Sequence, residues 1–306
     1  MSKKIATIDL GSNSFHMLIS EISDNGQAET LCIQKQKVQL RRGLTDELDI
    51  DEETQQRAIK CLRSFYQCIQ EYSVDEVVAV GTYTLRKAQE NIKEFKEKLD
   101  EAIGVNIKII SGEEEARLVY VGANSGSEKQ TLIVDIGGGS TEFVIGKNDD
   151  ILISKSLDIG CVGVQKEFFA DDKLSIENFE KAIAHAKDVI SEILPAYKKV
   201  GWNIALGSSG TIKSVMSVNN ALYGESSATK VFLEGFISQL IAKENVENIK
   251  FEGLREDKES VVAGGLAILY AIFDSFKIDE MQCSNGAVRE GALFEAVRDK
   301  FGIEIK

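Results

Sequence analysis

The chain has 306 residues, of which 43% are hydrophobic and 28% charged, and its formal net charge is −13. This length allows two domains, each with its own core. The acidic balance argues against general nucleic-acid binding, because a negative surface repels polyanions. No run of eighteen apolar residues occurs, so we expect no membrane-spanning helix and no membrane partner. The apolar run at the start is too short for a signal peptide, so we expect a cytoplasmic protein.

The numbers and spacing of histidines and cysteines restrict the metal sites and disulfides that the chain could form. Only two histidines occur, which excludes a His-rich metal centre. The five cysteines form no C-x-x-C pair, and we expect them to be free thiols in a reducing compartment.

The chain repeats itself. Residues 5–20 (IATIDLGSNSFHMLIS) resemble residues 131–146 (TLIVDIGGGSTEFVIG) when Asp9 is aligned with Asp135. In both segments, a glycine and a serine follow the acid at the same spacing, and a second apolar run comes next. Each segment therefore predicts a strand, a tight turn of small residues and a second strand.

Helical patterns separate the repeated segments. Residues 51–72 place apolar side chains on one face of a helix, and residues 175–199 do the same. Ser175 is the expected N-cap of the second helix. Pro195, the only proline, lies late in that helix and is expected to kink it.

The match continues downstream of these helices. Residues 77–86 resemble 203–213, and their glycines Gly81 and Gly207 each lie 72 residues after the aligned acid. A third pair, 107–116 and 279–288, appears in the same order but with about 47 extra residues in the second half. Ordered pairs of this kind indicate a duplication.

The predicted fold class follows from the repeat. Each half has the order β-β-β-α-β-α-β-α, which predicts an α/β protein with two mixed sheets flanked by helices. We place the first domain at 1–123 and the second at 124–291, with a helical, polar insertion near 220–265. A final helix at 292–306 is expected to pack back on the first domain. Two similar domains imply a cleft between them, where ligand sites commonly lie.

The two turns are candidates for phosphate binding. Turn glycines let backbone N–H groups approach an anion closely, and the hydroxyl groups add donors. The leading acids Asp9 and Asp135 could hold a hard cation, as could Glu142, which ends the second turn. Ordinary β-hairpins are the alternative interpretation. The candidate turn residues are Gly11, Ser12, Asn13, Ser14, Gly137, Gly138, Gly139, Ser140 and Thr141.

Three common active-site motifs are absent. The dinucleotide fingerprint is broken because Glu142 stands where its third glycine would be. Neither a P-loop nor a nucleophile elbow is present.

Acidic and basic residues extend the candidate site. Ser111-Gly-Glu-Glu-Glu115 opens a predicted helix, where acids favour the helix dipole or, at a site, deprotonate water. Spacing does not rank these three glutamates. The strand-end motifs at 81–86 and 207–213 each lead to a cation that could meet phosphate or merely solvent. Arg41 and Arg42 belong to a basic stretch that an exposed strand would also explain. The candidates from these motifs are Arg86, Gly207, Ser209, Gly210, Lys213 and Arg289.

Six ordered segments together resemble the exopolyphosphatase/guanosine pentaphosphate phosphohydrolase (Ppx/GppA) family. They run from residue 5 to about residue 295 and read IDLGSNSFHMLI, VGTYTLRKA, IISGEEEARL, VDIGGGSTEFVIG, ALGSSGTIK and SNGAVREGAL. The resemblance implies a duplicated actin-like (ribonuclease H-like) fold. It also implies release of terminal phosphate from inorganic polyphosphate or guanosine pentaphosphate. Longer members carry a further C-terminal domain, and this chain resembles the short two-domain form.

The resemblance also assigns roles. Glu115 would activate the attacking water, Arg86 would contact the phosphate, and Asp135 with Glu142 would hold Mg²⁺ or another divalent cation. Asp9 as a further metal acid is our own inference from the repeat. A homodimer is compatible with the sequence.

Two other functions fit the same fold. An acceptor-dependent sugar or acetate kinase would use Gly207–Thr211 in an adenosine pocket. A non-catalytic nucleotide or alarmone sensor would bind without turnover.

Overall fold

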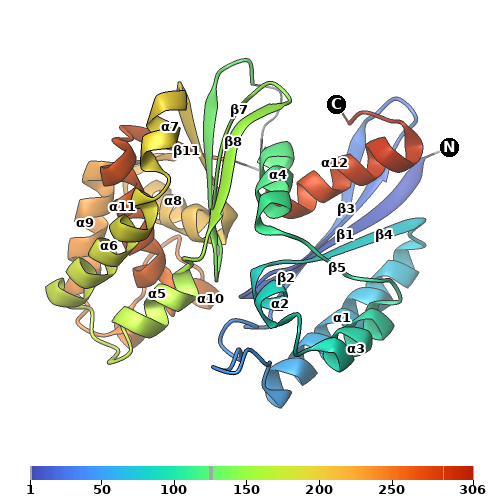
Figure 1. Ribbon diagram of the computed structural model, residues 1–306, viewed down its shortest axis with the longest axis horizontal. Coiled ribbons are helices and arrows are strands. Elements are labelled where there is room, and N and C mark those ends of the chain that lie inside the picture. The colour runs from blue at the N-terminus through green and yellow to red at the C-terminus, as the bar shows by residue number, and fades with distance from the viewer. Residues whose placement is uncertain (1, 124–126, 285, 306) are drawn as a thin grey trace. The chain divides into compact units, whose positions relative to one another are not determined.

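The computed structural model describes residues 2–123, 127–284 and 286–305 (Figure 1). The chain forms two compact units. Unit 1 contains Met1–Gly122 and Gly286–Lys306, and unit 2 contains Ala123–Asn285. Each unit has its own hydrophobic core, as the length of the chain predicts.

The described part of unit 1 contains a mixed sheet with the strand order β3-β2-β1-β4-β5. The first three strands are antiparallel neighbours, whereas β4 and β5 join in parallel. The strand bounds are β1 (Lys3–Leu10), β2 (Ser14–Ile22), β3 (Ala28–Lys37), β4 (Glu76–Gly81) and β5 (Lys108–Ile109).

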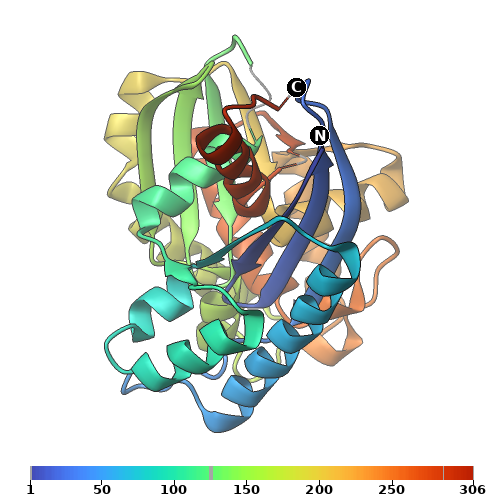
Figure 2. The same ribbon diagram turned by 90° about the vertical axis from the view of Figure 1, so that its right-hand side faces the viewer.

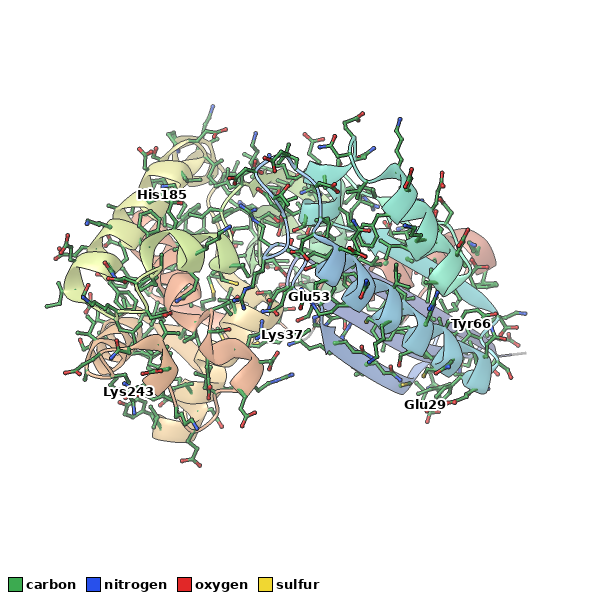
Figure 3. All side chains as sticks on the ribbon, turned by 90° about the horizontal axis from the view of Figure 1, so that it is seen from below. Glu29, Lys37, Glu53, Tyr66, His185 and Lys243 are labelled. Carbon is green, nitrogen blue, oxygen red and sulfur yellow. The ribbon has the colours of Figure 1, made fainter. Side chains whose placement is uncertain are left out.

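Helices cover both faces of this sheet. The predicted helix at 51–72 is confirmed as α1 (Glu52–Tyr72), whose N-cap Asp51 accepts a hydrogen bond from the Thr54 amide. Its apolar side packs in the core of unit 1, and its exposed side carries Glu53 and Tyr66 (Figure 3). The other helices are α2 (Tyr83–Ala88), α3 (Lys93–Ile103), α4 (Gly112–Ala123) and α12 (Val288–Phe301).

The end of the chain packs on the opposite face of β1 and β2, as expected (Figure 2). Leu293 and Val297 of α12 contact Ile5 and Leu18 there. The helix begins at Val288, four residues before the predicted start.

Unit 2 repeats the topology of unit 1. Its strand order β10-β11-β9-β6-β7-β8 contains the same succession, with β10 added at one edge. The duplication predicted from sequence is therefore present in the strand order itself. The bounds are β6 (Thr131–Ile136), β7 (Thr141–Lys147), β8 (Asp150–Leu157), β9 (Ile204–Ser208), β10 (Ser227–Thr229) and β11 (Glu280–Cys283).

The prediction of one continuous helix at 175–199 is wrong, because the structure has two helices there. α6 (Ile176–Ser191) begins after its N-cap Ser175, and α7 (Leu194–Val200) follows after a break. Pro195 lies in the first turn of α7, where its missing N–H costs nothing. Inside one continuous helix it would have removed a hydrogen bond, so the chain restarts the helix.

The region near 220–265 contains helices, and one of them contributes to the core of unit 2. α9 (Lys230–Ile241) buries Leu233, Phe236 and Leu240 in the core of unit 2. α11 (Val262–Phe276) is buried along most of its length and lies at the centre of that core. The remaining helices of unit 2 are α5 (Cys161–Phe168), α8 (Ser209–Tyr223), α10 (Glu256–Glu259) and the short 3₁₀ helix η1 (Val246–Asn248).

The five cysteines are free thiols, as predicted. Burial raises the pKa of Cys61 to about 12, which makes its thiol unreactive at neutral pH. In the part of the chain that the structure describes, no helix is long and apolar enough to cross a membrane.

Two glycines allow α4 and α12 to cross at backbone contact. A Cβ at Gly291 would lie 2.0 Å from Leu118 O, and one at Gly122 would lie 2.1 Å from Ala287 O. Arg117 of α4 also forms an ion pair with Glu295 of α12. Because backbone atoms cannot move aside as a side chain can, even a methyl group would force the helices apart.

We predict that Gly291→Ala lowers the free energy of unfolding by about 1–3 kcal/mol, since the added methyl overpacks this crossing. Gly235→Ala is the matched control, because Gly235 also lies within a helix but has open space around its Cβ position. Alanine there should stabilise the helix by about 0.5–1 kcal/mol. Urea unfolding of both variants measures the difference, and equal effects would contradict the proposed contact.

Candidate functional site

The first predicted turn joins β1 to β2. Gly11 is required there, because a Cβ would lie 2.9 Å from Ser14 O. Ser12, Asn13 and Ser14 are all buried. A hydrogen bond of 2.8 Å from Thr84 Oγ1 to Ser12 Oγ ties the turn to the start of α2. The turn is therefore a tight, fixed element and not a mobile hairpin loop.

Two donors of this turn suit an anion. Asn13 Nδ2 and Ser14 Oγ are buried and have no hydrogen-bond partner among the described residues. An unsatisfied buried polar group costs about 1–3 kcal/mol. Oxygen atoms of a phosphate would satisfy both groups. Asp9, at the end of β1, is only partly buried.

Glu115 is the one buried glutamate of the three at the start of α4. Arg86 Nη1 donates to Glu115 Oε2 at 3.0 Å and to Ile110 O at 2.8 Å. Glu113 is exposed, and a hydrogen bond from Arg117 lowers the pKa of Glu114. The structure thus singles out the glutamate that spacing left unranked, and places the predicted phosphate-binding arginine beside it.

The second predicted turn joins β6 to β7 and brings two acids together. Asp135 and Glu142 are directly paired across the two strands, so their side chains share one face of the sheet. Both are buried, and Ser156 Oγ donates to Glu142 Oε1 at 2.8 Å. Two buried carboxylates repel each other unless a cation or donors offset their charge.

This pair fits Mg²⁺ better than a transition metal. Among the described residues, no group of three or more His, Cys, Asp or Glu side chains could hold an ion. Mg²⁺ commonly uses one or two carboxylates, with water and substrate phosphates completing its octahedron. Asp135 and Glu142 are therefore a suitable donor set for a Mg²⁺ ion that arrives with a phosphate.

The start of α5 holds the second turn in place. Cys161 N donates to Gly137 O and Val162 N donates to Gly138 O, both at 3.0 Å. Thr141 Oγ1 donates to Ile159 O, and a Cβ at Gly160 would lie 2.4 Å from the backbone nitrogen of Gly139. The turn that contains Gly137, Gly138, Gly139 and Ser140 is therefore packed backbone to backbone.

The turn from β9 to α8 contains a lysine contact that the sequence did not reveal. Lys258 is only 8% exposed, and its Nζ lies 2.7 Å from the position of a Cβ on Gly210. Nothing in its sequence neighbourhood predicts a buried cation. Ser209 has a φ of +77° and donates to Ile136 O at 2.8 Å. Gly207 instead allows close packing, since a Cβ there would meet the side chain of Ile212 at 2.5 Å.

The last two predicted cations are less well defined. Lys213 lies near Cys283, whose pKa is raised by burial and partly lowered again by the lysine charge. Arg289 Nε donates to Glu290 Oε1 at 2.6 Å at the start of α12. An ion pair to a neighbouring residue weakens the case for Arg289 as a phosphate ligand.

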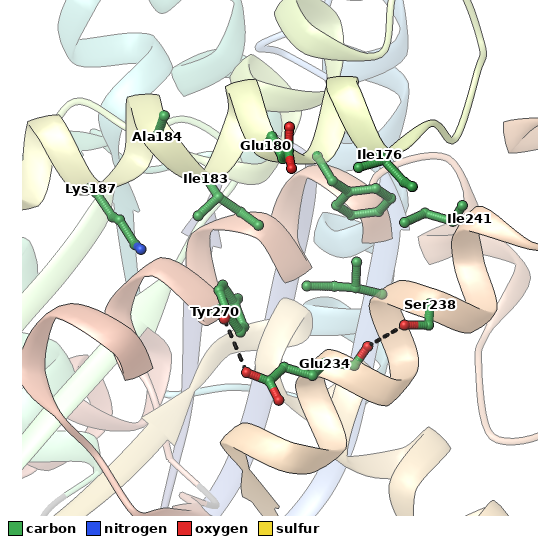
Figure 4. Close-up of a pocket in the computed structure, with 11 residues that line it drawn as sticks. Ile176, Glu180, Ile183, Ala184, Lys187, Glu234, Ser238, Ile241 and Tyr270 are labelled. Carbon is green, nitrogen blue, oxygen red and sulfur yellow. Dashed lines mark hydrogen bonds between the residues drawn. The ribbon is translucent and has the colours of Figure 1, made fainter.

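An apolar pocket of about 560 Å³ lies among α6, α9 and α11 of unit 2 (Figure 4). Aliphatic and aromatic side chains together form most of its wall, and Tyr270 OH donates to Glu234 within it. Its lysine, Lys187, is already paired with Asp274 at 2.6 Å. None of the predicted site residues lines this pocket, and its charges do not suit a phosphate.

Two mixed sheets with the same strand order, each with an acid-led turn of small residues, define a two-domain α/β fold, which the crystal structure of the Aquifex aeolicus member of the Ppx/GppA family shares with a TM-score of 0.79 at 24% identity, over 98% of this chain and 99% of that chain. The Ppx/GppA phosphatase family model matches residues 18–300, and the chain belongs to this family.

Individual relatives support the assignment. The chain is 40% identical to a putative exopolyphosphatase of Haemophilus influenzae, over 95% of this chain and 91% of that protein. It is also 40% identical to a guanosine-5'-triphosphate,3'-diphosphate pyrophosphatase of Pseudoalteromonas translucida, over 98% of this chain but only 61% of the relative. The chain thus spans about three fifths of the length of such pyrophosphatases. An exopolyphosphatase structure from Cytophaga hutchinsonii has the same fold, with a TM-score of 0.87, 24% identity and 99% of each chain covered.

We predict that Gly160→Ala disturbs the second turn and lowers the free energy of unfolding by about 1–3 kcal/mol. The backbone of Gly160 is extended, a conformation that alanine also adopts. The expected loss of stability therefore comes from the steric clash of the added Cβ with the turn. Gly163→Ala, one turn further along α5, meets nothing within 4 Å and serves as the control. Denaturant unfolding should separate the two, and an unchanged Gly160→Ala protein would argue against the backbone contact.

Proposed function

We propose that the protein is a phosphohydrolase that releases terminal orthophosphate from inorganic polyphosphate, guanosine pentaphosphate or both. The single observation that carries this proposal is the buried Glu115 carboxylate held by Arg86. The names of the relatives in the Ppx/GppA phosphatase family support the choice of substrates.

Glu115 would act as the general base. It takes a proton from water while the water oxygen forms a bond to the terminal phosphorus. The bond from that phosphorus to the bridging oxygen breaks, and the shortened substrate keeps the electron pair. Arg86 orients the carboxylate, since both protons of its Nη1 are used by Glu115 and Ile110. Its Nε and Nη2 remain to donate to phosphate oxygens.

Each turn offers features that suit a phosphate. In the first turn, Asn13 Nδ2 and Ser14 Oγ would donate to phosphate oxygens. In the second turn, the Gly137 amide already donates to Ser140 O. Asp135 and Glu142 would hold Mg²⁺, directly or through water. When bound, the ion offsets negative charge on the phosphoryl oxygens. Lys258 adds a positive charge beside Gly210.

The test of the base is Glu115→Gln, which keeps the shape of the side chain but cannot accept a proton. We predict a fall in kcat of about 10²–10⁴ on both substrates, with little change in KM. Glu113→Gln, two residues earlier and exposed, removes the same charge and should retain the activity of the parent. Release of inorganic phosphate is the measurement.

Other outcomes would point elsewhere. Equal rates in the parent and Glu115→Gln would remove Glu115 as the base. Phosphate transfer only in the presence of an acceptor would indicate a kinase. Binding without turnover in saturating Mg²⁺ would indicate a sensor.

The cation is tested separately. Removing divalent ions with EDTA should abolish activity, and added Mg²⁺ should restore it. Glu142→Gln should raise the Mg²⁺ concentration for half-maximal activity by about tenfold or more, because a carboxylate ligand is lost. Asp149→Asn removes an equal charge from the exposed β7–β8 connection and should leave the Mg²⁺ requirement unchanged. Full activity in EDTA would rule out the role of the metal.

A further inference from the structure

Arg41 lies beside the first turn and belongs to a well-anchored segment. Its backbone N donates to Ser12 O at 2.8 Å, and the Gln39 amide donates to Asn13 O at 2.9 Å. The flanking residues Val38 and Leu40 are buried in the core of unit 1. The backbone of Arg41 is therefore fixed against the turn that we assign to phosphate binding.

The side chains of Arg41 and Arg86 both lie close to the aromatic ring of Tyr83. The guanidinium carbons of Arg41 and Arg86 lie 5.9 and 5.8 Å from the centroid of the Tyr83 ring, and Lys87 Nζ lies 5.6 Å from it. The two arginines are consequently no more than about 12 Å apart. Three cations around one ring concentrate positive charge beside Glu115, within a chain whose net charge is −13.

Arg41 also has an unsatisfied donor. Its Nε is buried and has no hydrogen-bond partner among the described residues. Arg86, by contrast, is paired with Glu115 and Ile110. A buried donor on a charged group is costly when it has no acceptor, and the planar guanidinium fork matches phosphate oxygens. The neighbouring Arg42 is exposed and needs no such acceptor.

We propose that Arg41 is a substrate-binding residue that holds the phosphates behind the terminal one, while Arg86 and Glu115 act on the terminal phosphoryl group. This inference rests on the proposed hydrolase function. The ligand class is a linear run of at least two phosphates joined by anhydride bonds. Such a ligand offers acceptor oxygens to both arginines, whereas a single orthophosphate engages one of them.

The test measures binding of inorganic tripolyphosphate by calorimetry in the Glu115→Gln background, where the ligand is not hydrolysed. Arg41→Ala should weaken binding by about tenfold or more, since it removes a charged hydrogen bond. Arg42→Ala changes the net charge equally and should alter affinity by less than about twofold. In the otherwise unchanged enzyme, Arg41→Ala should raise KM with kcat nearly unchanged.

Arg41→Met is the second variant. It keeps the backbone hydrogen bond and an extended side chain over Tyr83, so it separates folding from phosphate binding. Weak binding by a folded Arg41→Met protein supports the inference. If Arg41→Ala and Arg42→Ala weaken tripolyphosphate binding equally, Arg41 contributes only through the overall charge of the protein. That result would overturn the inference. Loss of folding in both Arg41 variants would assign the residue to stability and overturn it as well.

The outcome for Arg41 is distinguishable from the outcome for the hydrolase. If the parent releases phosphate in a Glu115-dependent way but the Arg41 variants bind tripolyphosphate normally, the inference fails alone. If no substrate is hydrolysed while tripolyphosphate binding still depends on Arg41, the hydrolase function fails and the binding role stands.

Discussion

The structure depends on backbone contacts at two turns where no side chain fits. A Cβ at Gly11 would strike the Ser14 carbonyl, and a Cβ at Gly160 would strike the backbone of Gly138 and Gly139. These contacts leave each turn little freedom to rearrange. Donors that are fixed before the substrate arrives stabilise developing charge without the cost of reorganisation. The same glycines that make the turns rigid therefore make them suitable for phosphate chemistry.

The net charge of −13 is unfavourable for binding the polyanionic substrate that we propose. The distribution of charge resolves the difficulty. In unit 1, cations gather around the Tyr83 ring, and in unit 2 the buried Lys258 lies beside Gly210. A local positive potential in a low-dielectric setting attracts an anion although the rest of the surface repels it. The acidic remainder would also disfavour nonspecific binding of nucleic acid.

Sequence reasoning recovered what periodicity and repetition encode. Equal spacing from Asp9 and Asp135 predicted the duplicated strand order, which the two sheets show. It did not recover features that depend on three-dimensional packing. The burial of Lys258 arises where α10 meets the start of α8, and no local pattern reports it. The sequence predicts a kink at Pro195 and not a break, because a kinked helix and two consecutive helices show the same spacing of apolar residues.

The ranking of the glutamates shows the same limit. Three consecutive acids at a helix start all suit the helix dipole, so the sequence alone did not distinguish them. The family resemblance pointed to Glu115, and the structure adds a physical reason. Successive residues of a helix point about 100° apart, so only one of the three could face Arg86. That residue is the buried one, whereas Glu114 faces Arg117.

Replacing Arg86 and replacing Arg41, the two arginines beside the Tyr83 ring, would affect the stability of the protein differently. Replacing Arg86 would break its ion pair with the buried Glu115 carboxylate, and removing one partner of a buried pair typically costs about 3–5 kcal/mol. A loss of activity in such a variant would therefore mix folding with chemistry. Arg41 has no such dependent partner among the described residues, and its backbone hydrogen bond survives any substitution except proline. Of the two, Arg41 is the residue whose contribution to phosphate binding can be measured without disturbing the base.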